Sequence, residues 1–223
     1  MIYSTEETKK RIIDQLFWDN RVDASGINVE IVDGTVRLFG KVDSRLARQA
    51  AETDAHAVPG VTRVDNLLSV VSSHKTGPLP EEEIRNALRS IFEWNPDLSD
   101  QDIVIEVDVN VVRLEGAVDA YWKKKKAENL AGDVLGVAVV DNLLTVVPTH
   151  DLLDEIIAEN VVDALDRNVD IDIDTLDVEV EKGAVTLSGT VPGWSAYRAA
   201  QSIAQFTPGV TDVQNDLAIV PEF

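Results

Sequence analysis

Apolar and polar residues follow the same order three times along this chain, first with the period of a helix and then with the period of a strand. In the first copy a helical spacing places Ile12 and Leu16 on one face, together with Thr8 and Gln15, and Ser4-x-x-Glu7 has the pattern of a capping box. The matching positions in the later copies are more apolar: Ile84, Leu88, Ile91, Phe92, Ile157, Val161, Ala164 and Leu165. Each copy is therefore predicted to begin with an amphipathic helix.

A hairpin follows the first helix. Residues 27–31 alternate as a strand, and Asp33-Gly34 is a strong signal for a tight turn, because such a turn needs positive φ. The counterparts of Gly34 are Asn110 and Gly183, two residue types that tolerate this conformation. We therefore expect Gly34, Asn110 and Gly183 to have positive φ, with a second strand after each.

A second helix and a last strand complete each copy. Residues 44–58 form the helix in the first copy, with alanines stacked on one side, and Gly60 is the expected stop signal just past its end. Residues 61–71 alternate again as a strand. The predicted fold class is α/β (α+β), with three tandem α-β-β-α-β units, each placing two helices on a three-stranded mixed sheet.

The internal repeat is visible in the residues themselves. Residues 29–71 match residues 105–147 after a shift of 76 and residues 178–220 after a further shift of 73, and thirteen columns are identical in all three copies. A fixed period of this kind indicates one unit used three times. We predict unit boundaries of 1–75, 76–148 and 149–223.

These residues resemble a known family. The spacing Val36-x-Leu38-x-Gly40-x-Val42, then a helix, then Gly60-Val61-x-x-Val64-x-Asn66-x-Leu68, is similar to the BON domain (bacterial OsmY and nodulation), and the other copies repeat it. The resemblance implies a non-enzymatic α/β unit that attaches to phospholipid or to cell-envelope surfaces, often under osmotic stress. A protein–protein adaptor or stress-related stabiliser, in which three similar faces give avidity, is the alternative.

Charge and composition narrow the possible partners. The formal net charge is −20, with −1 on residues 1–75, −7 on residues 76–148 and −12 on residues 149–223. A strongly acidic chain opposes nucleic acid, whose affinity depends on Lys and Arg contacts to phosphate. The chain has no cysteine, no run long enough for a transmembrane segment and no signal peptide at its start. We expect a cytoplasmic protein, or a periplasmic one if an export signal has been removed.

The best candidate for a ligand contact is a basic run in the second copy. Lys123, Lys124, Lys125 and Lys126 follow Trp122, and helical spacing makes Lys123 and Lys126 neighbours. Such a patch suits a phosphate or lipid headgroup beside an interfacial tryptophan. A solvated helix face that balances nearby acids is the competing interpretation, and the other copies lack the patch.

Other positions that recur between the copies have both a structural and a functional interpretation. The motif glycines Gly40, Gly116 and Gly189 fit strand positions where backbone packs closely, or a ligand that approaches the backbone. Asn66 and its counterparts fit a hydrogen bond from strand to loop, or a ligand contact. Trp18 and Trp94, at the end of the first helix, fit core or inter-unit packing, with an exposed aromatic anchor as the alternative.

The sequence predicts no enzyme, no cofactor and no metal site. Asp170-x-Asp172-x-Asp174 with Glu181 is similar to a calcium loop, but Thr175 stands where the loop requires glycine. The three histidines are separated, and the chain has no nucleophile, phosphate-loop or zinc-protease motif.

Overall fold

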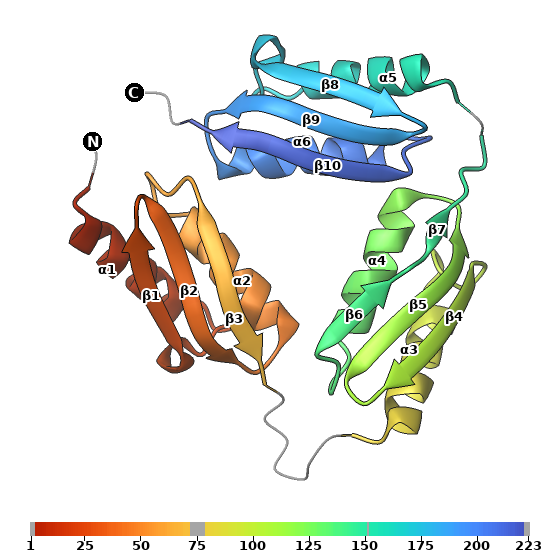
Figure 1. The fold of residues 1–223 in the computed structure, drawn as a ribbon, viewed down its shortest axis with the longest axis horizontal. Coiled ribbons are helices and arrows are strands. Elements are labelled where there is room, and N and C mark those ends of the chain that lie inside the picture. The colour runs from red at the N-terminus through yellow and green to blue at the C-terminus, as the bar shows by residue number, and fades with distance from the viewer. Residues whose placement is uncertain (1–2, 72–78, 151, 221–223) are drawn as a thin grey trace. The chain divides into compact units, whose positions relative to one another are not determined.

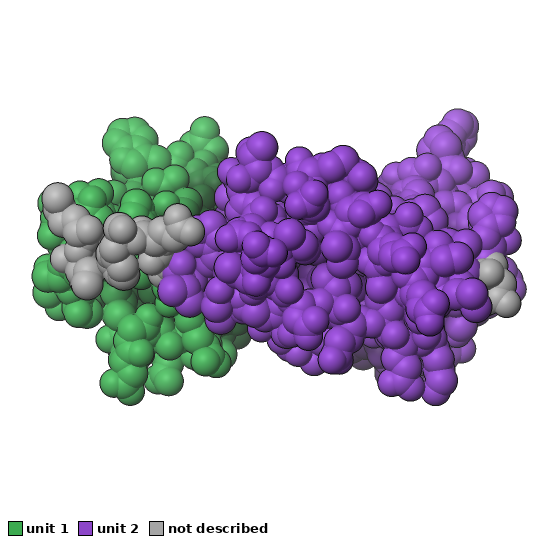
Figure 2. All heavy atoms as spheres, turned by 90° about the horizontal axis from the view of Figure 1, so that it is seen from above, with its two compact units in different colours: residues 1–78, 221–223 green, residues 79–220 purple. Residues whose placement is uncertain are grey.

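The computed structural model describes residues 3–71, 79–150 and 152–220, and the chain forms two compact units. The first comprises residues 1–78 with 221–223, and the second residues 79–220 (Figure 2). The first unit holds one copy of the repeat (repeat 1), and the second holds the other two (repeats 2 and 3). The predicted boundary between residues 75 and 76 lies outside the described residues.

Each repeat has the predicted element order, so the α+β prediction is confirmed (Figure 1). Repeat 1 consists of α1 (Thr5–Trp18), β1 (Ile27–Val32), β2 (Thr35–Val42), α2 (Arg45–His56) and β3 (Val64–Val70). Repeat 2 consists of α3 (Glu81–Trp94), β4 (Asp102–Asp108), β5 (Val111–Val118), α4 (Tyr121–Gly132), β6 (Val139–Asn142) and β7 (Thr145–Val146). Repeat 3 consists of α5 (Asp154–Asp166), β8 (Leu176–Glu181), β9 (Ala184–Val191), α6 (Trp194–Phe206) and β10 (Asp212–Ile219).

The middle strand of every sheet is the second strand of its repeat. β2 pairs antiparallel with β1 and parallel with β3, and β9 pairs in the same way with β8 and β10. In repeat 2 the third strand is divided into β6 and β7, both of which pair parallel with β5. Each repeat therefore has a mixed sheet, with both helices on one face (Figure 1).

Capping serines account for where the two helices of repeat 1 begin. The Ser4 hydroxyl accepts the Glu7 N–H at the start of α1, and the Ser44 hydroxyl accepts the Ala47 N–H at the start of α2. Ile12 and Leu16 of α1 are buried, as the helical pattern predicts. These side-chain oxygens satisfy backbone donors that a helix leaves unpaired in its first turn.

The second helix of each repeat packs closely on its sheet because small side chains face it. Two alanine columns are fully buried in all three repeats: Ala51, Ala55, Ala127, Ala131, Ala200 and Ala204. An asparagine of the third strand then bonds to the helix. Asn66 donates to the Arg48 carbonyl (2.9 Å) and Asn142 to the Lys124 carbonyl (2.9 Å). The partner is thus a helix and not a loop, because this strand face lies beneath the second helix.

The motif glycine of the middle strand lies where another chain segment crosses it. Gly116 has φ of 114°, and a Cβ built there would overlap the backbone carbonyl oxygen of Asp102. Gly40 and Gly189 meet the carbonyls of Gly26 and Thr175 in the same way. The backbone itself fills the space that a side chain would need.

The hairpin turns agree with the prediction at two of three sites. Gly34 and Gly183 have φ of 78°. Asn110 is not among the residues with positive φ, although Val109 before it has φ of 54°, like Asp33 (51°) and Lys182 (53°) at the same position of the other turns. The Glu81 carboxylate accepts the Val109 N–H (3.1 Å), so the first helix of repeat 2 holds the backbone of its hairpin turn. A β-branched residue in this conformation is strained.

We predict opposite effects for two substitutions in these turns. Gly34→Val lowers the free energy of unfolding of repeat 1 by about 1 kcal/mol or more, because valine fits positive φ poorly and no neighbouring atom is close enough to compensate. Val109→Asn raises the stability of repeat 2 by up to about 1 kcal/mol, since asparagine tolerates this backbone. Chemical denaturation of the full chain measures both. Equal stabilities of Gly34→Val and wild type would contradict the assignment of the turn.

A second prediction concerns the crossing at the motif glycine. Gly116→Ala costs about 2 kcal/mol or more, because the methyl group requires the Asp102 backbone to move and the φ is unfavourable for alanine. Gly193→Ala is the matched control: a Cβ there meets no atom within 4 Å, and repeat 2 has Ala120 at this position. Thermal unfolding of the two variants should separate them clearly, and similar melting temperatures would refute the close approach.

Candidate functional site

The predicted basic run lies on the first turns of α4, and its lysines have acidic neighbours. Lys123 Nζ lies 2.9 Å from Asp119 Oδ2, and Lys125 Nζ lies 2.9 Å from Glu128 Oε2. Lys126 pairs with Asp97, which comes from the loop after α3. Three of the four predicted contact lysines are thus already neutralised within repeat 2, and Lys123 keeps only 13% of its side chain exposed.

Trp122, the predicted aromatic partner of these lysines, is only partly exposed. Its ring centroid lies 5.9 Å from that of Phe206 in α6. Lys123 Nζ and Lys126 Nζ lie 5.8 Å and 5.9 Å from the Trp122 ring, so the expected grouping of Trp122, Lys123 and Lys126 is present. The tryptophan nevertheless covers a neighbouring repeat as well as facing solvent.

Tyr121 strengthens this junction between repeats 2 and 3. Its side chain belongs to the apolar core cluster of repeat 3, although the residue begins a helix of repeat 2. Burial, with the nearby Asp212 carboxylate, raises the pKa of the Tyr121 hydroxyl to about 12. The phenol therefore stays neutral, and the N-terminal end of α4 serves as a packing surface.

Aromatic side chains at the end of the first helix are exposed, which the sequence left as an alternative. Trp18 is 79% exposed and Trp94 is 86% exposed, so the expectation that these rings pack into a core is wrong. In repeat 1 the neighbouring Phe17 is also exposed, and its ring lies edge-on to Trp18 at 5.6 Å. Charged Arg167 takes the place of these tryptophans in repeat 3.

Exposed apolar residues continue along the outer side of α1, beside a basic triplet. Ile13 is 44% exposed and lies one turn before Phe17, while Lys9, Lys10 and Arg11 occupy the preceding turn. Arg11 lies over the Tyr3 ring and 3.9 Å from Glu7. Lys9 and Lys10 have no ion pair in the part of the chain that the structure describes. We call Lys9, Lys10, Ile13, Phe17 and Trp18 the α1 outer face.

Two features of the sequence mark the α1 outer face, although hydrophobic periodicity, which identifies buried positions, does not detect them. The triplet Lys9-Lys10-Arg11 is a second, shorter basic run, and the pair Phe17-Trp18 follows the last buried position of the helix. Ile12 and Leu16 already satisfy the core. Apolar residues directly beside them are surplus to packing, and this excess points to a contact surface.

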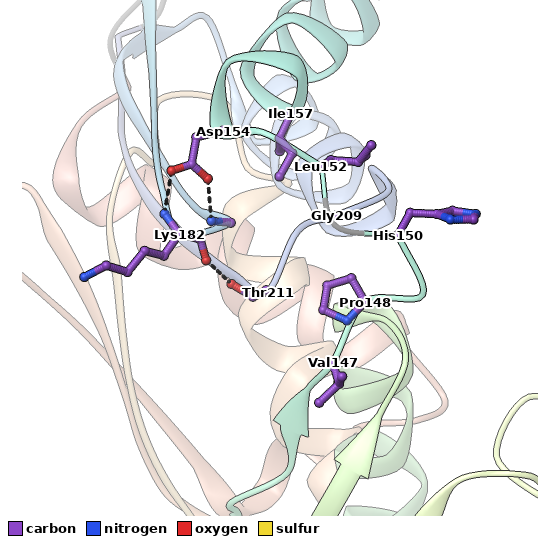
Figure 3. Close-up of a pocket in the computed structure, with 10 residues that line it drawn as sticks. Val147, Pro148, His150, Leu152, Asp154, Ile157, Lys182, Gly209 and Thr211 are labelled. Carbon is purple, nitrogen blue, oxygen red and sulfur yellow. Dashed lines mark hydrogen bonds between the residues drawn. The ribbon is translucent and has the colours of Figure 1, made fainter.

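A pocket of about 490 Å³ lies where the chain enters repeat 3 (Figure 3). Its polar groups are already used by the fold. The Asp154 carboxylate accepts the N–H groups of Lys182 and Gly183 (2.8 Å each), and the Thr211 hydroxyl donates to the Lys182 carbonyl. In Figure 3 the side chains of Lys182 and His150 point away from the pocket. The pocket thus lacks converging free polar groups.

Neither a cluster of metal ligands nor a membrane-spanning helix is present among the described residues. Residues 3–71, 79–150 and 152–220 contain no group of three or more histidines or acids placed to hold a metal ion. In those same ranges, no helix has the length and apolar character that crossing a bilayer requires.

Comparison with known proteins finds a matching family model and a curated relative. The BON domain model matches residues 4–72, 80–148 and 153–221. The chain is 30% identical over 170 residues to Osmotically-inducible protein Y of Escherichia coli (strain K12), covering 70% of this chain and 78% of that protein.

Similar solved structures include two of CdsD, a structural protein of the type III secretion system of Chlamydia trachomatis. One covers 96% of this chain and 92% of that chain, and the other, its C-terminal domain, covers 99% and 100%. Both have a TM-score of 0.28 and 13% identity, which is too distant to inform function. The three family matches together span nearly the whole sequence, and this chain belongs to the BON domain family.

Proposed function

We propose that this protein is a non-enzymatic, osmotic-stress-related protein that attaches to anionic phospholipid at the cell envelope through the α1 outer face. The observation that carries the proposal is the joint exposure of Phe17 (70%) and Trp18 (79%) on the helix that carries Lys9 and Lys10 about two turns earlier. Aromatic rings favour the boundary between headgroups and acyl chains, and lysines favour anionic headgroups. The relationship to Osmotically-inducible protein Y supports the stress context.

Charge distribution supports repeat 1 as the contact. Residues 1–75 carry a net charge of −1, whereas the later repeats carry −7 and −12. Repulsion from an anionic surface is therefore weakest at repeat 1. Because such forces are screened beyond a Debye length of about 8–10 Å, contact depends on groups at the surface itself. The α1 outer face supplies both apolar and basic groups at close range.

The run Lys123–Lys126 with Trp122 remains a predicted contact with the same kind of surface. Engagement there requires the lysines to leave Asp119, Glu128 and Asp97, or to bind while still paired. Because each of these lysines would exchange a carboxylate partner for a phosphate, the net gain in binding free energy is smaller. The α1 outer face needs no such exchange for Lys9 and Lys10, which is why we place the primary contact there.

A protein–protein adaptor or stress-related stabiliser is the second candidate. Trp94 favours it, since the ring is 86% exposed on α3, whose first turn contains Glu81, Glu82 and Glu83. An acidic helix is poorly suited to an anionic membrane. An exposed tryptophan at a repeated position fits a protein partner that engages more than one repeat.

Vesicle flotation of the full chain tests the phospholipid proposal. Wild type should float at low salt with vesicles of phosphatidylglycerol and phosphatidylcholine, and much less with phosphatidylcholine alone or at high salt. The double variant Phe17→Ser/Trp18→Ser should bind at least about tenfold more weakly, because burying two aromatic side chains contributes about 2–4 kcal/mol. Trp94→Ser is the matched control and should float like wild type.

The same assay separates the two candidate surfaces. A Lys123–Lys126 quadruple Lys→Gln variant should float nearly as well as wild type if α1 provides the contact. Loss of flotation in this variant alone would transfer the contact to α4. Wild type that fails to float under every condition would overturn lipid attachment and leave the adaptor, which a pull-down with wild type and Trp94→Ser then tests.

A further inference from the structure

Repeat 1 has two buried titratable residues on one helix. In the part of the chain that the structure describes, the buried polar or charged residues are Asp54 (6% exposed) and His56 (9% exposed), both in α2. Asp54 Oδ2 has no hydrogen-bond partner there. Burying such groups costs free energy, so their presence in a small core calls for an explanation.

The other repeats show that this fold does not require titratable groups at these positions. Leu130 and Ile203 occupy the position of Asp54, and both pack against the cores of their repeats. Gly132 and Gln205 occupy the position of His56. Repeat 1 therefore replaces an apolar contact with an acid and adds an imidazole, on the same scaffold.

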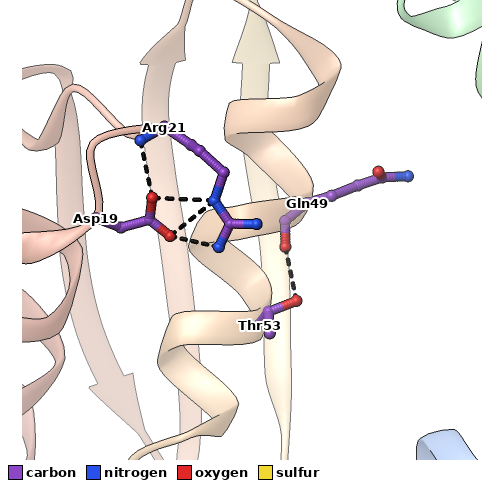
Figure 4. Close-up of polar contacts among 4 residues, drawn as sticks. All are labelled: Asp19, Arg21, Gln49 and Thr53. Atoms are coloured by element: carbon purple, nitrogen blue, oxygen red, sulfur yellow. Dashed lines mark hydrogen bonds and ion pairs between the residues drawn. The ribbon is translucent and has the colours of Figure 1, made fainter.

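The end of α1 differs in the same repeat. Asp19 follows α1, and its carboxylate accepts the Arg21 N–H (2.8 Å) and pairs with the Arg21 guanidinium (Figure 4). Asn95 and Asn168 make the same backbone bond in the other repeats without a charge. Asp19 and Arg21 are the charged groups that act on Asp54, and the charged residues of the adjoining strands, Arg37, Lys41 and Asp65, alternate onto the opposite sheet face.

The pKa values of the two buried residues shift in opposite directions. Burial and the neighbouring Asp19 carboxylate raise the pKa of Asp54 from 3.8 to about 6. Burial lowers the pKa of His56 from 6.5 to about 4. The Arg21 guanidinium lowers the pKa of Asp19 to about 2, so Asp19 stays charged throughout this range.

Each shift has a definite consequence for stability. The folded state holds the Asp54 proton more tightly than the unfolded state, so the contribution of Asp54 is full below pH 3.8 and is lost as the pH rises through about 6. The unfolded state holds a proton on His56 more tightly, so its contribution is full above pH 6.5 and is lost as the pH falls toward 4. The two pH ranges overlap, and within them the contributions of Asp54 and His56 to folding stability change in opposite directions.

We propose that Asp54 and His56 form a compensating pair that keeps the stability of repeat 1 nearly constant between neutral and mildly acidic pH, whereas either residue alone would make this repeat pH-sensitive. Both belong to the same two turns of α2, so one opening of this helix exposes both to water. At mildly acidic pH the opened helix gains a proton at His56 and loses one at Asp54. The number of bound protons therefore changes little on opening, and so does the pH dependence of stability. The device is independent of what the α1 outer face binds.

Hydrogen exchange of the full chain, resolved by mass spectrometry, tests the pair repeat by repeat. The substitutions come from the chain itself: Asp54→Leu, as in repeat 2, and His56→Gln, as in repeat 3. Protection of α2 is compared at about pH 5 and about pH 7.5 after correction for the intrinsic rate, with α4 and α6 as internal controls. Opposite pH dependences of the two variants are the diagnostic result.

The expected sizes follow from the two shifts. His56→Gln should leave α2 about tenfold better protected at about pH 5 than at about pH 7.5, since only Asp54 still titrates. Asp54→Leu should reverse this, with about thirtyfold weaker protection at the lower pH. Wild type should change by about threefold or less, and the double variant should follow α4 and α6.

An NMR titration of the wild-type chain keeps the test independent of how the variants fold. The Asp54 side-chain carboxyl should titrate well above its ordinary value of 3.8, and the His56 ring well below 6.5. Ordinary midpoints for both groups would overturn the proposal. So would variants whose α2 protection changes with pH in the same direction.

Discussion

Close contact between the second helix and its sheet is the constraint on which each repeat depends. Six fully buried alanines across the three repeats keep this distance short, and no larger side chain fits without moving the helix. The asparagine of the third strand then reaches the helix backbone, as Asn142 does at the Lys124 carbonyl. A polar side chain beneath a helix is thereby satisfied, and the parallel pairing of the third strand is held in register.

Because small residues shared by all three repeats make that contact, most of the remaining surface is free to differ between repeats. Apolar surplus on α1 stays exposed in repeat 1, whereas the start of α4 uses Tyr121 and Trp122 to cover repeat 3. Surface substitutions away from caps and cores change stability little. A threefold repeat can thus keep one core and give each copy a separate surface role.

Much of the fold could be predicted because its signals are local. The capping serine Ser4, the apolar spacing of α1 and the glycine after Asp33 each act within a few residues. At the second hairpin Asn110 lacks the positive φ of Gly34 and Gly183, because its Cβ makes that conformation costlier than it is for glycine. A contact from helix to turn does not explain the difference, since Glu81 binds the Val109 N–H as Asp154 binds the Lys182 N–H. Such a contact joins residues 28 positions apart and leaves no trace in the turn sequence.

The candidate surfaces were harder to predict because burial and pairing decide them. Lys126 meets Asp97 from 29 residues away, and Trp122 meets Phe206 of another repeat. The sequence pattern showed a basic run but not its counter-charges, and it suggested buried tryptophans where Trp18 and Trp94 are exposed. Likewise, nothing local distinguishes Asp54 from the many solvated acids of the chain. Comparison of repeats supplies the missing signal, since Leu130 and Ile203 mark that position as apolar.

Charge and surface chemistry together favour a division of labour between the repeats. If α1 touches an anionic surface, repeats 2 and 3 with net charges of −7 and −12 are repelled from it, so the near-neutral repeat faces the membrane. A repeat in that position meets the lower pH found close to anionic lipid, where protons accumulate as counter-ions do. Opposed titrations of Asp54 and His56 would preserve the packing of α2 there, and with it the scaffold that holds α1. This preservation does not require lipid contact, because the two opposed pKa shifts arise from burial and from Asp19 within repeat 1 itself.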